Sequence, residues 1–181
     1  LKNIQIKFNK RTLRSEIMLT PFGIEGSGIY ALSSFIRDEI IKSSKAIITL
    51  DLMPDLTTEQ VIERLNVKKK KVSLSNHFRK SLGLSRKIFI LLKEILDERE
   101  FECSEKLANK IKNLDIELVK ARPIDEAIST SGGVCFSELN DHMELKKVPG
   151  VYITGEMLDF EAPTGGYLLQ GCFSSAYSAV S

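Results

Sequence analysis

The residues with the clearest chemical potential lie near the end of the sequence, in the segment GEMLDFEAPTGGYLLQG at 155–171. Three acids, Glu156, Asp159 and Glu161, precede a Pro-Thr-Gly-Gly turn, and the apolar run after the turn predicts a helix. A carboxylate in the loop between a strand and a helix can accept hydrogen bonds from ligand hydroxyls, such as those of a ribose or ribitol. The free N–H groups and the positive dipole end of the helix suit an anionic or electron-rich group.

Two pairs of glycines mark places where another group could approach the backbone closely. Gly165 and Gly166 stand at the start of the expected helix, and Gly132 and Gly133 lie in STSGGV between extended segments. From the residues alone, the first pair fits a ligand contact or an ordinary strand–turn–helix capped by Thr164 about equally well. The second pair fits a bulge better than a ligand contact, although glycines in strand-like runs also mark close approach.

Other common site chemistries have little support in the sequence. His77 and His142 are far apart and lack a nucleophile motif, so no hydrolytic triad is predicted. The chain has two histidines and three cysteines that form no CxxC, so no metal site is expected. A reducing, cytoplasmic location is expected. The apolar neighbours of Cys135 and Cys172 predict buried packing residues. No apolar run approaches about 18 residues, so no membrane span is expected.

Composition and periodicity predict a mixed α/β protein. The chain has 181 residues, 43% of them hydrophobic, and a net charge of +2, which is too small to indicate a nucleic-acid partner by itself. Residues 1–55 look mainly β, because Ile4, Ile6 and Phe8 alternate with polar residues and 46–52 reads as another strand.

Residues 56–113 change character and predict a small helical subdomain. Thr57, Ser85 and Ser104 are placed to start three helices. The segment carries 14 lysines and arginines against 8 acids. These cations, above all Lys68–Lys71, could contact nucleic-acid phosphates, although a solvated basic face is the commoner explanation.

From residue 114 the pattern returns to strands. Extended segments are predicted at 116–121, 127–136 and 150–158, and the last helix is predicted from Gly165 onward.

At these motifs the sequence resembles a known family. ARPIDEAISTSGGVCFSELN and KKVPGVYITGEMLDFEAPTGGYLLQGCFSSAYSAV resemble the C-terminal part of the BaiN/YhiN-like flavoproteins, which are NAD(P)/FAD-dependent oxidoreductases of bacteria. SEIMLTPFGIEGSGIYALS and LDLMPDLTTEQVIERL are similar to segments inserted into that family's FAD domain. The resemblance implies an α/β (α+β fragment) fold with three parts. These are an inserted β-rich domain at 1–55, a basic helical subdomain at 56–113, and the C-terminal return of a split Rossmann-like FAD-binding domain at 114–181.

The resemblance also implies which residues contact FAD. Gly155 and Glu156 match the place where related flavoproteins put a carboxylate on the ribitol chain, and Asp159 matches the second acid of the GE-x-LD pattern. The start of the last helix would face the N1/C2=O edge of the flavin, and the GGV motif would let the isoalloxazine approach. The residues matched to the helix start and to GGV are Thr164, Gly165, Gly166, Tyr167, Leu168, Gly132 and Gly133.

The implied function is an oxidoreductase in which FAD carries hydride between NAD(P)H and an unknown substrate. No side chain stands out as a catalytic acid or base. The sequence opens directly in a strand-like pattern and lacks the family's GxGxxG half, so we expect a fragment or split subunit with a companion chain carrying that half. Two alternatives stay open: a non-catalytic remnant unable to bind FAD alone, and an RNA-binding module built on the basic helical segment.

Overall fold

The computed structural model describes residues 1–67, 74–127, 129–162 and 165–181. They divide into unit 1, Leu1–Ile29 with Glu39–Val119, and unit 2, Tyr30–Asp38 with Lys120–Ser181. Unit 1 combines an antiparallel sheet with helices, which confirms the expected α/β (α+β) class. The three domains expected at 1–55, 56–113 and 114–181 stay a prediction.

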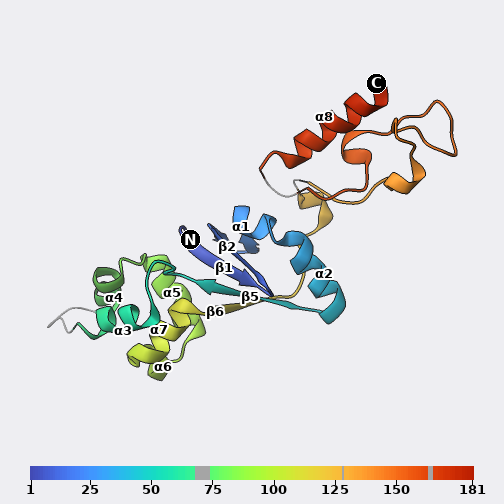
Figure 1. Ribbon diagram of the computed structural model, residues 1–181. Helices are drawn as coiled ribbons and strands as arrows, with labels where there is room; N and C mark the ends of the chain where they lie inside the picture. Colours follow the sequence, from blue (N-terminus) through green and yellow to red (C-terminus); the bar gives the residue numbers. More distant parts are fainter. Residues whose placement is uncertain (68–73, 128, 163–164) are drawn as a thin grey trace. The chain divides into compact units, whose positions relative to one another are not determined.

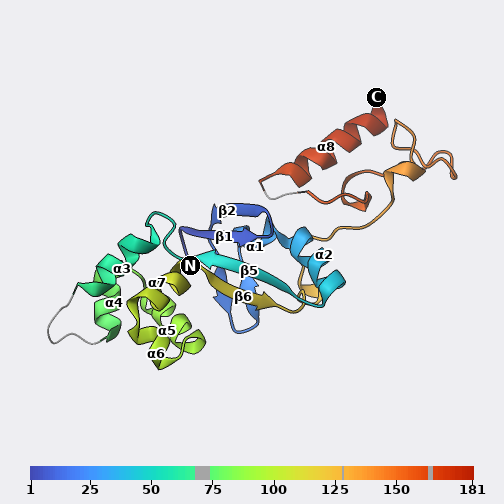
Figure 2. The ribbon, with the colours of Figure 1, turned by 60° about the horizontal axis from the view of Figure 1, so that its bottom comes forward.

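The main sheet of unit 1 has four antiparallel strands in the order β2-β1-β5-β6, which can be followed in Figure 2. In β1 the side chains of Ile4, Ile6 and Phe8 are buried, so the predicted period-2 pattern is confirmed. A slip of one residue would turn this apolar set to the other face, which fixes the register. The strands are β1 (Ile4–Phe8), β2 (Arg11–Ser15), β5 (Ala46–Asp51) and β6 (Leu114–Leu118).

A small hairpin and two helices connect β2 to β5. They are β3 (Met18–Thr20), β4 (Gly23–Glu25), α1 (Ser27–Tyr30) and α2 (Ser33–Ser43). The hairpin leads into a glycine-rich turn, where a Cβ atom added at Gly28 would lie 2.4 Å from Cδ1 of Ile6. A side chain at position 28 would therefore collide with the core of the sheet.

Five helices gather beside the sheet of unit 1 (Figure 1). The Thr57 hydroxyl accepts a hydrogen bond from Gln60 N at 3.3 Å, and Gln60 Oε1 accepts one from Thr57 N at 2.9 Å, so the predicted cap is a full capping box. Ser85 is also an N-cap, because its hydroxyl accepts a hydrogen bond from Ile88 N at 3.5 Å, but without the reciprocal bond of a capping box. Ser104 is the first residue of the third predicted helix. The helices are α3 (Thr58–Asn66), α4 (Leu74–Leu82), α5 (Arg86–Ile95), α6 (Glu98–Glu102) and α7 (Ser104–Lys112).

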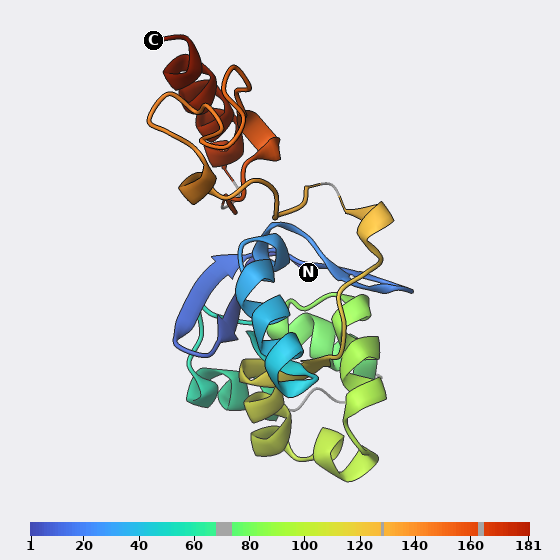
Figure 3. The same cartoon turned by 90° about the vertical axis from the view of Figure 1, so that its right-hand side faces the viewer.

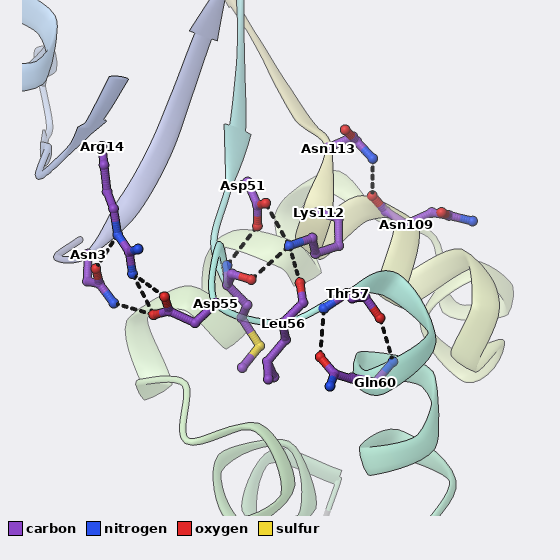
Figure 4. Close-up of polar contacts among 11 residues, drawn as sticks. Asn3, Arg14, Asp51, Asp55, Leu56, Thr57, Gln60, Asn109, Lys112 and Asn113 are labelled. Carbon is purple, nitrogen blue, oxygen red and sulfur yellow. Dashed lines mark hydrogen bonds and ion pairs between the residues drawn. The ribbon is translucent and has the colours of Figure 1, made fainter. Parts of the chain in front are cut away.

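A buried ion pair ties these helices to the sheet (Figure 4). The ammonium group of Lys112, at the end of α7, lies 2.7 Å from Asp51 Oδ2 at the end of β5. It also donates hydrogen bonds to the backbone carbonyls of Met53, at 2.8 Å, and Leu56. Asp51 Oδ1 accepts from Met53 N at 2.9 Å. All three ammonium protons therefore have acceptors, as burial of a charge requires.

Unit 2 lacks two strands that the sequence predicts. The segments 127–136 and 150–158 form no strand among the described residues and are joined there by one isolated bridge, Val134 with Leu158. The backbone φ angles are +105° at Gly132 and +66° at Gly155, and such angles interrupt an extended chain. These two strand predictions are wrong because local β propensity was outweighed by the glycine conformations.

The elements of unit 2 are short turns followed by one long helix. They are η1 (Ile124–Glu126), η2 (Phe136–Glu138), η3 (Gly155–Met157) and α8 (Tyr167–Val180). Leu139, Ile153 and Leu158 form a small buried cluster. Figure 3 shows α8 lying beside the loops of this unit, and α8 contacts η3. Among the residues that the structure describes, no helix has the length and apolar character needed to cross a membrane.

Candidate functional site

The GGV and GEMLD motifs, which are separate in sequence, lie against each other in unit 2. Val134 N donates a hydrogen bond to Met157 O at 2.8 Å, and Asp159 N donates one to Val134 O at 2.9 Å. These two bonds make a single parallel bridge between Val134 and Leu158. The structure therefore brings together two of the segments that the sequence assigned to one site.

Position 133 needs a glycine because another segment of the backbone lies against it. A Cβ atom built at this position would lie 2.3 Å from Met157 O and 2.9 Å from Met157 C. Of the two explanations that the sequence left open, close approach by another backbone thus accounts for this glycine. Its neighbour Gly132 differs, since a Cβ atom there would have no heavy atom within 4 Å.

The start of η3 is held on the middle of α8. Gly155 N donates to Ser175 Oγ at 3.0 Å, and Ser175 Oγ donates to Cys172 O at 3.0 Å. Ser175 is only 6% exposed, so its hydroxyl is committed to these two bonds. Ser175 was not among the predicted site residues, because its partner lies 20 residues away and no local pattern marks it.

The beginning of α8 is open. Gly166 is the N-cap, with φ +87°, and it provides no side-chain cap for the first N–H groups of the helix, which begins with Tyr167 and Leu168. A Cβ atom at Gly166 would meet nothing within 4 Å, and one at Gly165 would reach only the Tyr167 ring, at 3.8 Å. Thr164, which was expected to contribute here, lies outside the described residues. The predicted last helix is confirmed, and it begins at Tyr167, two residues after the predicted start at Gly165.

The two expected acids differ in their surroundings. Glu156 is exposed and forms no hydrogen bond or ion pair with another described residue, so its carboxylate can accept from a ligand hydroxyl. Asp159 is also exposed, and Cys135 Sγ donates to its Oδ2 at 3.8 Å. Cys135 is itself exposed, so the prediction that it is a buried packing residue is wrong. Its apolar sequence neighbours do not surround it in space.

Arg37 connects two loops of this region and was not found from the sequence. Its guanidinium lies 3.0 Å from Glu161 Oε2 and donates to Ser131 Oγ at 3.2 Å. Hydrogen bonding to Glu161 raises the pKa of Arg37, which keeps the side chain charged. The residue thereby links the chain just before GGV to the chain just after GEMLD. Because Ser131 lies 94 residues further along, no local motif signals the contact.

A family model described as the HI0933-like protein barrel and H2TH domain matches residues 1–129. The chain belongs to the HI0933-like family. This is the BaiN/YhiN-type flavoprotein family that the sequence resembles, so the resemblance is confirmed. The expected cofactor-binding residues at 132–168 lie beyond the matched segment.

Two curated relatives have names that refer to different substrates. The 3-dehydro-bile acid delta(4,6)-reductase of Clostridium scindens is 26% identical over 174 residues, covering 91% of this chain and 42% of the relative. The ribosomal RNA dihydrouridine synthase of Escherichia coli is 24% identical over 178 residues, covering 94% of this chain and 42% of the relative. This chain thus spans less than half the length of the curated relatives that it matches.

Proposed function

We propose that this chain provides part of the flavin site of an FAD-dependent oxidoreductase that moves hydride between NAD(P)H and a substrate. One observation carries the proposal: hydrogen bonds join GGV, GEMLD and α8 into a single assembly. Val134 pairs with the GEMLD segment, and Gly155 is bonded to Ser175 of α8. Because the N-cap Gly166 has no side chain to cap α8, and a Cβ atom at this glycine would meet no heavy atom within 4 Å, a ligand could reach the backbone there.

The residues present fit a flavin in three respects. The first N–H groups of α8 carry partial positive charge, which suits the electron-rich N1/C2=O edge. Glu156 has a free carboxylate to accept a hydrogen bond from a ribitol hydroxyl. Gly132 leaves open space beside the GGV loop. When bound, FAD supplies the hydride chemistry, and the role of these residues is to hold and orient it.

A companion polypeptide completes the proposed site. Along one stripe of α8 the side chains of Leu169, Phe173, Tyr177 and Val180 are 61%, 67%, 72% and 85% exposed. Their spacing of three and four residues places them on one helix face. An apolar stripe of this kind is a binding surface for another polypeptide. The occupant proposed here is the GxGxxG half of the FAD domain, in keeping with the greater length of the relatives.

Reconstitution tests the proposal. The purified chain is mixed with a polypeptide equivalent to the N-terminal half of the curated relatives, and FAD is added before gel filtration. We expect the complex to carry a visible flavin spectrum, and we expect Phe173→Glu to prevent the complex from forming. Arg122→Glu is the control, because it also changes charge but lies outside α8. A complex that forms without retaining flavin would favour the non-catalytic remnant.

A further inference from the structure

Among the helices that the structure describes in residues 56–113, the excess of positive charge lies on one pair. The α4–α5 pair, from Leu74 to Ile95, has five lysines and arginines and a single acid. The following segment, from Asp97 to Lys112, has four cations and five acids. Among the described residues of 56–113, the excess of positive charge therefore lies on α4 and α5.

Four of these cations lie at the turn between the two helices and are not neutralised by neighbours. Arg79 and Lys80 are in the last turn of α4, and Arg86 and Lys87 open α5. All four are exposed, and none forms an ion pair with another residue in the described ranges. We call these four residues the basic turn.

Helix electrostatics does not account for the two cations in α5. The N-terminal end of a helix carries partial positive charge, so acids are favoured there and lysine or arginine is disfavoured. The first turn of α5 nevertheless contains Arg86 and Lys87 and no acid. The exposed positive charge of these side chains instead attracts anions from solution.

The aromatic residues near the basic turn cannot stack on nucleic-acid bases. Phe78 is 2% exposed and Phe89 is 8% exposed. Their ring centroids are 5.4 Å apart, and both rings also pack on Phe101. Base recognition by stacking is therefore unavailable at this surface, and contacts would go to the phosphate backbone.

We propose that the basic turn binds the phosphate backbone of RNA. Charge complementarity argues for a polyanion, and the E. coli relative that aligns with 94% of this chain is named for ribosomal RNA. The proposal deepens the proposed function by naming RNA as the partner presented to the flavin, although binding itself requires no flavin. Lys68–Lys71, which the sequence singled out, lie outside the described residues.

The test measures the affinity of the full chain for a structured RNA hairpin over a series of salt concentrations, without flavin. One variant carries Gln in place of Arg79, Lys80, Arg86 and Lys87. The control variant loses the same charge from the other helices of the subdomain, through Arg64→Gln, Arg99→Gln, Lys106→Gln and Lys110→Gln. Each phosphate contact contributes roughly 0.7–0.9 to the magnitude of the slope of log K against log salt. The four substitutions of the first variant should therefore reduce the magnitude of this slope by about 3.

The outcomes separate cleanly. A loss of slope confined to the basic-turn variant supports the proposal, whereas an equal loss in both variants, or none, overturns it. Equal binding of polyglutamate would also overturn it, because the surface would then recognise negative charge of any kind. We expect Arg86→Gln with Lys87→Gln to leave the unfolding temperature unchanged or higher, so weaker binding cannot be ascribed to unfolding. Because flavin retention is measured separately, its failure would leave this result standing.

Discussion

In unit 1 the strands and helices bury a large core of apolar side chains, whereas in unit 2 α8 turns its large apolar side chains outward. Ile6, Ile48 and Leu92 are fully buried in unit 1, while Phe173 and Tyr177 are 67% and 72% exposed. The side of α8 that meets its own unit instead carries Ser175 and Gly171, which contact Gly155 N and the Phe160 ring.

The two units differ in where they bury their large apolar side chains. Burial of large apolar side chains is the main source of folding free energy, and unit 1 obtains it from its own residues. Unit 2 packs through glycines, backbone bonds and one small cluster, so its largest apolar surface is still available. The exposed apolar face of α8 in unit 2 is the surface to which the proposed function assigns a partner.

The largest expected effect comes from removing the buried ion pair of unit 1. Lys112→Met leaves Asp51 charged and buried without its partner, which should lower the free energy of unfolding by about 3–5 kcal/mol. Urea denaturation measures the change. The matched control is Lys45→Met, which removes the exposed pair with Glu117 and should cost less than about 1 kcal/mol. Similar losses in the two variants would show that the buried pair does not hold unit 1 together.

The next effect addresses backbone packing in unit 2. Gly133→Ala places a Cβ atom against Met157 O and should separate the GGV and GEMLD segments, at a cost of about 2–4 kcal/mol. Gly132→Ala is the control, since it strains a positive φ but enters open space, and about 1 kcal/mol is expected. Amide exchange at Val134 and Asp159 reports the local opening. Equal protection in both variants would contradict the role given to Gly133.

Much of unit 1 could be predicted from the sequence because its signals are local. The alternation of Ile4, Ile6 and Phe8 identifies a strand, and the caps at Thr57 and Ser85 identify helix starts. The strand β2 was missed because RTLRS has a single apolar residue and lies at the sheet edge.

Unit 2 was harder to predict because its structure depends on contacts between distant residues. The apolar, β-branched segments at 127–136 and 150–158 have strand propensity, yet glycines with positive φ interrupt them. Arg37 and Ser175 became visible only once the folded chain placed their partners beside them. The motifs named the region of the site, but not the bonds that hold it.

The smallest expected effect lies on the surface of unit 1. A hydrogen bond from Arg14, and a second from Asn3, lower the pKa of Asp55 below its ordinary value of 3.8. The stability from this contact is therefore complete above pH 3.8 and lost as the pH falls through the lowered folded pKa. NMR titration of the Asp55 carboxyl should show a value nearer 3.8 in Arg14→Gln. An unchanged titration would mean that the contact shown in Figure 4 does not persist in solution.

Flavin retention by two glycine variants of unit 2 tests the central claim most directly. Gly166 and Gly150 have similar φ angles, +87° and +83°, and a Cβ atom meets nothing within 4 Å at either position. Replacing each with valine therefore imposes comparable strain, but only Gly166 stands at the proposed flavin edge. In the reconstituted complex we predict that Gly166→Val abolishes the visible flavin spectrum and that Gly150→Val retains it. A folded Gly166→Val complex with full flavin content would contradict the account.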